Sequence, residues 1–239
     1  ITQKFHLYPH RKFPFDAWLP GRPESITRFV ADCGDQPFFL MHNIPSPHRP
    51  FQGHIRRTGH SLVDAQAAPP PGFLPDTPAV RADWAEYLTC VEITDDAVGQ
   101  ALEALRRSGR YEDTLILYCG DNGPSYHRGK MSVYDFGLRV PLIAAGPGVR
   151  RGVQTQELTS LVDLMPTLAD YAGAELPRPV QGTSLRPLLE GQTGARGHDA
   201  VYGEVHFGIG PQACQARSVF DGRYHYLRTY NTDKPHVMC

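Results

Sequence analysis

Cysteine is scarce in this 239-residue chain, and the few thiols are spread unevenly along it. The five cysteines form no C-x-x-C pair, and their number is odd. Both features argue against a closed disulfide framework. We therefore expect buried or incidental thiols rather than cross-links.

The chain also lacks a charge excess and a long apolar run. Lysine and arginine number 24 against 25 aspartates and glutamates, which gives a net charge of -1. This balance excludes the basic surface that binds nucleic acid or an anionic membrane. No apolar run approaches the roughly 18 residues of a membrane span. With 41% hydrophobic and 21% charged residues, the composition is typical of one large globular domain, alone or with a smaller piece.

Neither end of the chain carries a signal that marks a natural start or stop. The sequence opens at Ile1 rather than Met and shows no charged-then-apolar segment of the signal-peptide kind. It closes soon after the strand-like run YHYLRTY. These features indicate an internal fragment of a longer protein.

The first half of the chain predicts helices joined by proline-rich connections. Apolar residues at helical spacing begin after Thr77, which suits an N-cap, and end at Gly109. A shorter helical pattern covers 24–33, and the apolar run PFFLM at 37–41 predicts a buried strand. Residues 51–76 have no clear periodicity, so we expect a long irregular connection there.

The second half predicts strands and helices in an order typical of an α/β fold. We expect a central, mostly parallel sheet flanked by helices, followed by the start of a small antiparallel C-terminal subdomain. The expected domains are therefore residues 1–195 and residues 196–239. The expected strands are 114–118, 140–146, 201–205 and two runs around Asp221-Gly222, and the expected helix is 160–173, which ends at Gly173.

The stretch CGDNGPSYHRGK, which follows TLILY, allows two interpretations. Asn122-Gly123 is a strong signal for a tight hairpin. Alternatively, Asp121 and Asn122 offer a carboxylate and an amide oxygen just past a strand, where ligands sit in open α/β sheets. Such hard oxygens suit Ca²⁺ or Mg²⁺, and His127 and Lys130 follow closely. These residues alone leave both interpretations open.

Two further histidine-containing stretches are candidates for chemistry. His48 stands between two prolines, which hold its backbone extended and limit its mobility. This arrangement would present a general acid at the end of a strand, although an ordinary surface histidine fits it too. In Lys4-Phe5-His6 the alternation would place both polar side chains on one face of an extended segment.

Taken together, six ordered segments resemble the sulfatase family of the alkaline phosphatase superfamily. They cover nearly all of residues 1–191, and they favour a metal site over a hairpin at Asp121-Asn122. The resemblance implies an alkaline phosphatase-like α/β fold. The segments are QKFH, PFFLMHNIPSPHRPF, TLILYCGDNG, GKMSVYDFGLRVPLI, SLVDLMPTLADYAG and QGTSLRPLLEG.

The resemblance also implies roles for individual residues. Sulfuryl transfer moves negative charge among oxygens, so fixed cations at those oxygens favour the transition state, and a histidine can protonate the departing group. The implied metal ligands are Asp121 and Asn122, which would form half of a site for a divalent cation, usually Ca²⁺. The implied catalytic residues are Lys4, His6, His48 and Lys130, and the implied substrate-facing residues are His127, Glu204 and His206.

Within the family, the segments FPFDAW, PHRPF, GEVHFG and ARSVFDGRYHYLRTYN resemble the sulfamidases, which act on N-sulfoglucosamine-type groups. The implied partner is a sulfated saccharide, with no nucleic acid and no membrane, and proteins of this kind are secreted, periplasmic or lysosomal. Two alternatives stay open, a phosphoester hydrolase of the same superfamily and a non-catalytic protein that binds sulfoglycans or metal. Glu204 and His206 fit an ordinary strand pair equally well.

The chain departs from the family at the nucleophile. Sulfatases use a formylglycine made from Cys or Ser in a C/S-x-P-x-R motif, and this sequence contains no such motif. The early Asp-Asp pair of metal ligands is also missing. We expect both in a missing N-terminal part, and we predict that the isolated chain does not hydrolyse sulfate esters.

Overall fold

The chain forms two compact units, Ile1–Thr114 and Leu115–Cys239. Two of the predicted site residues, Lys4 and His6, lie outside the described residues. The sequence-based division between residues 195 and 196 stays a prediction. The computed structural model describes residues 1–2, 10–176, 180–206 and 215–230.

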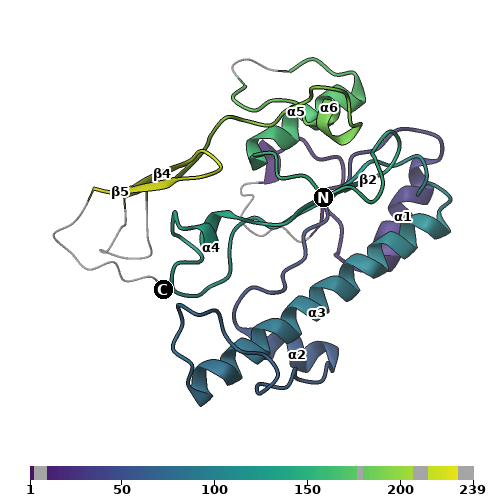
Figure 1. Cartoon of the computed structure of the whole chain (residues 1–239). Coiled ribbons are helices and arrows are strands. Elements are labelled where there is room, and N and C mark those ends of the chain that lie inside the picture. The colour runs from purple at the N-terminus through teal and green to yellow at the C-terminus, as the bar shows by residue number, and fades with distance from the viewer. Residues whose placement is uncertain (3–9, 177–179, 207–214, 231–239) are drawn as a thin grey trace. The chain divides into compact units, whose positions relative to one another are not determined.

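Helices dominate the first unit, and the longest of them organises it. As predicted, this helix begins at Thr77, whose hydroxyl accepts a hydrogen bond from Val80 N at 3.3 Å. Helices α1 and α2 both pack against α3 (Figure 1). The helices of this unit are η1 (His10–Lys12), α1 (Pro23–Cys33), α2 (Phe51–Thr58) and α3 (Pro78–Arg107).

Helix α2 shows that the prediction of an irregular connection across 51–76 was wrong in its first third. The helix ends at Gly59, which adopts the left-handed conformation with a φ of 73°. Phe51 is buried and contacts the ring of Tyr87 in α3, with the ring centroids 5.8 Å apart. Apart from Phe51, only Ile55 is a large apolar residue, so the sequence offers almost no helical periodicity. Packing on α3 supplies the stabilisation that a helix this short lacks by itself.

The segment 37–41 is also not the buried strand that its composition predicts. Phe39 and Met41 are 54% and 37% exposed. Among the described residues, strand-like pairing at this segment is limited to its end. Thr2 N donates a 2.9 Å hydrogen bond to Met41 O, and Thr2 forms an isolated parallel bridge with His42. Apolar composition predicts an extended segment, but burial also requires neighbours that cover its faces.

The second unit contains two small antiparallel sheets among short helices. One pairs β1 with β2, and the other has the order β3-β4-β5, with the last two strands on either side of the predicted Asp221-Gly222 turn. Among the described residues, parallel pairing is limited to isolated bridges from Thr2 to Leu19 and to His42. The strands are β1 (Ile116–Cys119), β2 (Leu142–Ala145), β3 (Val201–Val205), β4 (Ala216–Phe220) and β5 (His225–Thr229); the helices are α4 (Asp135–Leu138), η2 (Leu161–Asp163), α5 (Leu164–Ala172) and α6 (Arg186–Leu189).

The predicted helix 160–173 is present as η2 and α5, and it ends at Gly173 with a left-handed φ of 63°. Asp163, at its start, is fully buried and joins three segments. Its carboxylate accepts hydrogen bonds from Ser160 N at 2.8 Å and from Thr183 N at 2.9 Å, and His198 Nε2 lies 2.9 Å from both oxygens. A single carboxylate therefore fixes the entry to the helix and two later loops.

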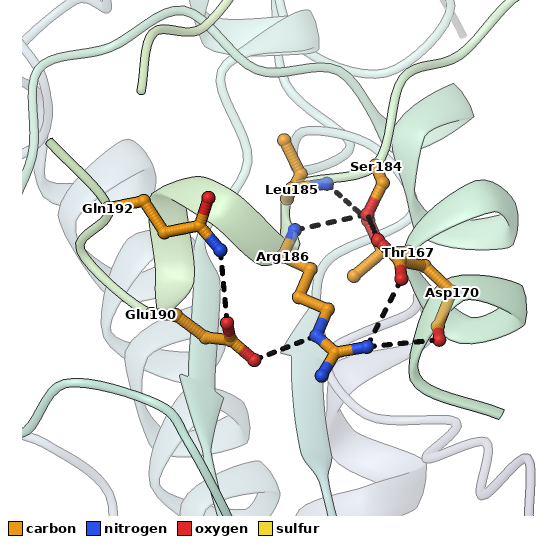
Figure 2. Close-up of polar contacts among 7 residues, drawn as sticks. All are labelled: Thr167, Asp170, Ser184, Leu185, Arg186, Glu190 and Gln192. Atoms are coloured by element: carbon orange, nitrogen blue, oxygen red, sulfur yellow. Dashed lines mark hydrogen bonds and ion pairs between the residues drawn. The ribbon is translucent and has the colours of Figure 1, made fainter. Parts of the chain in front are cut away.

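A polar network joins α5 to α6, and Figure 2 shows the Arg186 guanidinium between the carboxylates of Asp170 and Glu190. Arg186 Nε donates to Glu190 Oε1 at 2.7 Å, and Nη1 donates to Asp170 Oδ1 at 3.2 Å. Beside it, Thr167 Oγ1 accepts a 2.8 Å hydrogen bond from Leu185 N. These contacts hold the segment QGTSLRPLLEG against α5, although such partly exposed ion pairs add little stability.

No helix in the part of the chain that the structure describes has both the length and the apolarity needed to cross a membrane.

The three cysteines among the described residues, Cys33, Cys90 and Cys119, are free thiols. Cys90 is fully buried. This agrees with the expectation of buried or incidental thiols.

Candidate functional site

Asp121 and Asn122 follow the carboxyl end of β1, as the sequence predicts, and the hairpin interpretation of Asn122-Gly123 is wrong. A tight type I′ hairpin needs positive φ at both central residues, and neither of these residues has a positive φ. Residues 120–141 lie between β1 and β2, so this pair of residues does not connect the two strands directly. The turn is instead the beginning of a long loop that includes α4.

Close contacts between backbone segments shape this loop. Gly123 N donates to Gly137 O at 2.9 Å, and Lys130 N donates to Pro124 O at 2.8 Å. A Cβ on Gly123 would overlap the carbonyl oxygen of Phe136, so only glycine fits there. The loop is thereby closed on itself, with Asp121 and Asn122 at its start and Lys130 on the same loop.

The side chains of Asp121 and Asn122 are exposed and fit part of the ligand set of a hard divalent cation. Asn122 Nδ2 donates to Gly123 O at 2.7 Å, which leaves Oδ1 as the amide oxygen for a cation. Among the described residues, no group of three or more His, Cys, Asp or Glu side chains could hold a metal ion. Asp121 and Asn122 could therefore supply only part of a coordination shell, and their role as metal ligands stays a prediction.

Lys130 and His127 lie on the same loop. Lys130 is half-buried, and within the described residues its ammonium group makes no hydrogen bond or ion pair. His127 is exposed and likewise has no polar partner in that part of the chain. A half-buried ammonium without a carboxylate beside it favours the binding of an anion.

Cys119 is the last residue of β1 and comes two residues before Asp121. Burial raises the pKa of the Cys119 thiol, and the Asp121 carboxylate raises it further. Burial likewise raises the pKa of Cys90. A thiol with a raised pKa is a poor nucleophile at neutral pH, so neither residue replaces the nucleophile that the sequence lacks.

His48 lies in the first unit, on a loop whose backbone is attached at three points. Ser46 Oγ donates to Cys90 O at 2.7 Å, and Arg49 donates two hydrogen bonds to the Asp83 carboxylate, at 2.8 and 2.5 Å. His54 Nε2 donates to His48 O at 2.9 Å. The loop is therefore held to α3 and α2, which supports the prediction that His48 has a restricted backbone.

The His48 ring is exposed, and its orientation selects one tautomer. Nδ1 lies 2.6 Å from Arg49 O, and because a carbonyl oxygen can only accept, Nδ1 carries a proton. Nε2 is then the nitrogen that can exchange a proton with a ligand. The Arg49–Asp83 pair positions this loop, and no local sequence pattern predicts it because the two residues lie far apart in the chain.

Thr2 is the last described residue before the predicted Lys4-x-His6 pair, and it lies beside Asn43 in the segment that leads to His48. Thr2 is fully buried; its hydroxyl accepts from Asn43 N at 3.0 Å and lies 2.8 Å from His42 Nδ1. Asn43 Nδ2 also donates to Thr2 O at 2.6 Å. The roles of Lys4 and His6 themselves stay predictions.

The position of His42 leads to a prediction about pH. Burial lowers the pKa of His42 below its ordinary value of 6.5, so the unfolded chain takes up a proton on His42 before the folded chain does. Stability is therefore lost as the pH falls through about 6.5. We expect a lower melting temperature at about pH 5.5 than at about pH 7.5, measured by circular dichroism. His42→Asn keeps an acceptor near the position of Nδ1 but cannot titrate, and it should reduce this difference; an unchanged difference would contradict the prediction.

Glu204 and His206 belong to the β3-β4-β5 sheet. Glu204 faces Arg217 in the register of β3 and β4, and its carboxylate lies 3.5 Å from Arg217 Nε and 3.0 Å from His206 Nε2. All three side chains are more than half exposed. Their contact with substrate stays a prediction, and the ion pairs also fit the strand-pair alternative.

Two family models match the chain. The model for sulfatases matches residues 24–174, and the model described as N-sulphoglucosamine sulphohydrolase, C-terminal, matches residues 125–238. The chain is 29% identical over 238 residues to N-sulphoglucosamine sulphohydrolase from Homo sapiens, covering 80% of this chain and 47% of that protein. It is 31% identical over 188 residues to N-acetylglucosamine-6-sulfatase from Homo sapiens, covering 65% of this chain and 33% of that protein.

A solved structure with a similar fold is the phosphonate monoester hydrolase SpPMH from Silicibacter pomeroyi. The match has a TM-score of 0.63 and 26% sequence identity, and it covers 87% of this chain and 52% of that one. This match confirms the predicted fold class. The chain spans about half the length of that structure and of the human sulphohydrolase.

Proposed function

Because the chain belongs to the sulfatase family, as its motifs predicted, we propose that it carries part of a catalytic site that hydrolyses sulfate ester or sulfamate groups on a saccharide. The observation that supports this most directly is the closed loop after β1. Asp121, Asn122 and Lys130 all belong to this loop, and the Gly123–Gly137 hydrogen bond closes it.

Each candidate residue has a defined part in the proposed site. Asp121 and Asn122 hold a divalent cation, Ca²⁺ by family resemblance, and a bound cation supplies positive charge where sulfate oxygens gain negative charge. Lys130 binds a sulfate oxygen. His48 protonates the departing oxygen or nitrogen through Nε2.

The remaining candidates complete the proposal. Lys4 and His6 contact the sulfate and the nucleophile, and His127, Glu204 and His206 face the saccharide. We expect the nucleophile from outside this chain, whose sequence has no C/S-x-P-x-R motif. Of the described cysteines, Cys90 and Cys119 have thiols whose pKa burial raises.

The substrate class that we propose is an N-sulfoglucosamine-type group of a sulfated glycan. The similarity to N-sulphoglucosamine sulphohydrolase and to the C-terminal family model supports this choice. A phosphoester or phosphonate ester is the second candidate, and the match to SpPMH favours it. Sulfate and phosphate groups both present tetrahedral anionic oxygens, so Lys130 and a bound cation suit either.

The proposal is tested by titrating the purified chain with glucosamine 2-N-sulfate, in Ca²⁺ and in a chelator, by isothermal calorimetry. We expect binding that depends on Ca²⁺, and a roughly tenfold loss in Lys130→Met because one charge-assisted contact to the sulfate disappears. Asp121→Asn should remove the dependence on Ca²⁺. The same samples should release no sulfate above a protein-free blank, because the nucleophile motif is absent from the sequence.

Matched controls replace exposed residues of the same types. Lys12→Met and Asp199→Asn remove one charge each at exposed positions, and both should bind like the unchanged chain. If the affinity is the same in a chelator as in Ca²⁺, and the same in Lys130→Met as in the unchanged chain, the proposed site is wrong. Release of sulfate would show that the chain is active by itself. Tighter binding of glucosamine 6-phosphate than of the N-sulfate would favour the phosphoester alternative.

A further inference from the structure

The β3-β4-β5 sheet has one face toward α4 and an opposite face that is exposed. On the first face, His225 Nδ1 lies 2.6 Å from Asp135 Oδ1 of α4, and Gly203 leaves room for the side chain of Leu138. Successive side chains of a strand point to opposite faces. Residues one position away from His225 and Gly203 therefore point outward, and we call this side the outer sheet face.

One line of residues across the outer sheet face is apolar and aromatic. In the register of the sheet, Tyr202 faces Val219, and Val219 faces Tyr226. Tyr202 and Tyr226 are 79% and 63% exposed. Two rings that lie on either side of a valine, each largely open to solvent, form a surface on which a sugar ring can stack.

The neighbouring line of residues is charged. Glu204 faces Arg217, and Arg217 faces Arg228 on the next strand. Like charges directly opposite each other on adjacent strands are destabilising. Glu204 pairs with Arg217 at 3.5 Å, whereas Arg228 forms no ion pair within the described residues. The line therefore has one more cation than it has carboxylates to balance it.

A third line extends the positive surface. Both guanidinium groups lie over the ring of Tyr230, Arg217 at 5.8 Å and Arg228 at 5.0 Å from its centroid. Arg217 and Tyr230 also line a hollow of about 130 Å³ together with His206, Gln215 and Ala216. The hollow places hydrogen-bond donors next to Arg217.

We propose that the outer sheet face is a binding surface for a sulfated oligosaccharide. Sugar rings lie on Tyr202 and Tyr226, and sulfate groups bridge Arg217 and Arg228, whose planar donors suit two-point recognition of sulfate oxygens. A bridging sulfate removes the repulsion between the two facing arginines. The choice of a sulfated saccharide rests on the proposed function, while the surface itself rests on the sheet register and its exposed side chains.

The test measures binding of a heparin-derived octasaccharide to the full chain by calorimetry, with a desulfated octasaccharide of the same length for comparison. We expect the sulfated form to bind more tightly and its binding to weaken with salt. Replacing both arginines, Arg217→Gln with Arg228→Gln, should lower the affinity roughly tenfold or more. Tyr226→Ser should lower it without changing the salt dependence. Circular dichroism checks that each variant stays folded.

The controls separate this surface from the site on the loop after β1. Arg196→Gln removes an exposed arginine on another segment and should bind like the unchanged chain. In a chelator, which removes the Ca²⁺-dependent binding expected at the loop after β1, the octasaccharide should still bind, and the double arginine variant should still weaken that binding. If Lys130→Met abolishes binding and the double arginine variant does not, the outer sheet face is not the site. Equal binding of the desulfated octasaccharide, or of a single-stranded oligonucleotide of equal charge, would overturn the proposal as well.

Discussion

Gly123→Ala should destabilise the second unit by about 3 kcal/mol, the largest effect that we expect from adding one methyl group. A Cβ at Gly123 would lie closer to Phe136 O and to the Gly137 backbone than Cβ atoms ever do in proteins. The clash is with backbone on a segment that also donates and accepts loop hydrogen bonds, so no side-chain rotation relieves it. Urea unfolding measures the loss, and calorimetry should show that Ca²⁺-dependent binding of glucosamine 2-N-sulfate disappears with it.

Gly120→Ala is the matched control for this prediction. The nearest atoms to a Cβ at Gly120 are Pro141 Cδ and Val140 Cβ, both at 3.4 Å, which is ordinary contact. Its stability should stay within about 0.5 kcal/mol of the unchanged chain. If the two variants are equally stable, the close backbone packing of the loop is not a constraint, and the argument that it fixes Asp121 and Asn122 fails.

The second large effect is expected for Asp163→Ala, which should cost about 3 kcal/mol or more. The substitution leaves the backbone N–H groups of Ser160 and Thr183 without their acceptor, and it removes the partner of His198. Each unsatisfied buried donor costs about 1–3 kcal/mol. For a chain of this size, the melting temperature should fall by roughly 10 °C.

Two variants show whether the effect comes from the hydrogen bonds of the carboxylate. Asp163→Asn keeps one carbonyl oxygen and should fall between the unchanged chain and Asp163→Ala. Asp199→Asn changes an exposed aspartate and should leave the melting temperature unchanged. A melting temperature of Asp163→Ala within 2 °C of the unchanged chain, taken here as about the resolution of the measurement, would show that water or other groups satisfy the same donors.

The elements that the sequence predicts well are those that local chemistry decides. Helix α3 has a threonine cap and a long apolar periodicity, and it begins where these signals place it. The strands around Asp221-Gly222 follow from turn residues between β-branched and aromatic runs. Helix α2 and the segment 37–41 depend instead on which neighbours cover them, and composition does not contain that information.

The same division applies to the candidate site. Asp121, Asn122 and Lys130 could be placed on one loop because they are close in the chain. The contacts that shape the site join distant residues, as in Arg49 with Asp83 or Gly123 with Gly137. No periodicity or motif records such pairs, so the motifs identified candidate ligands but not what holds them.

The three attachments of the His48 loop limit how the first unit can respond to ligands of different size. A change in the loop backbone would first have to break the buried bond from Ser46 to Cys90 and the paired bonds from Arg49 to Asp83. Rotation of the exposed imidazole about its own bonds breaks neither. Movement in this region is therefore confined to one side chain, and any group that approaches His48 must adjust to the loop rather than reshape it.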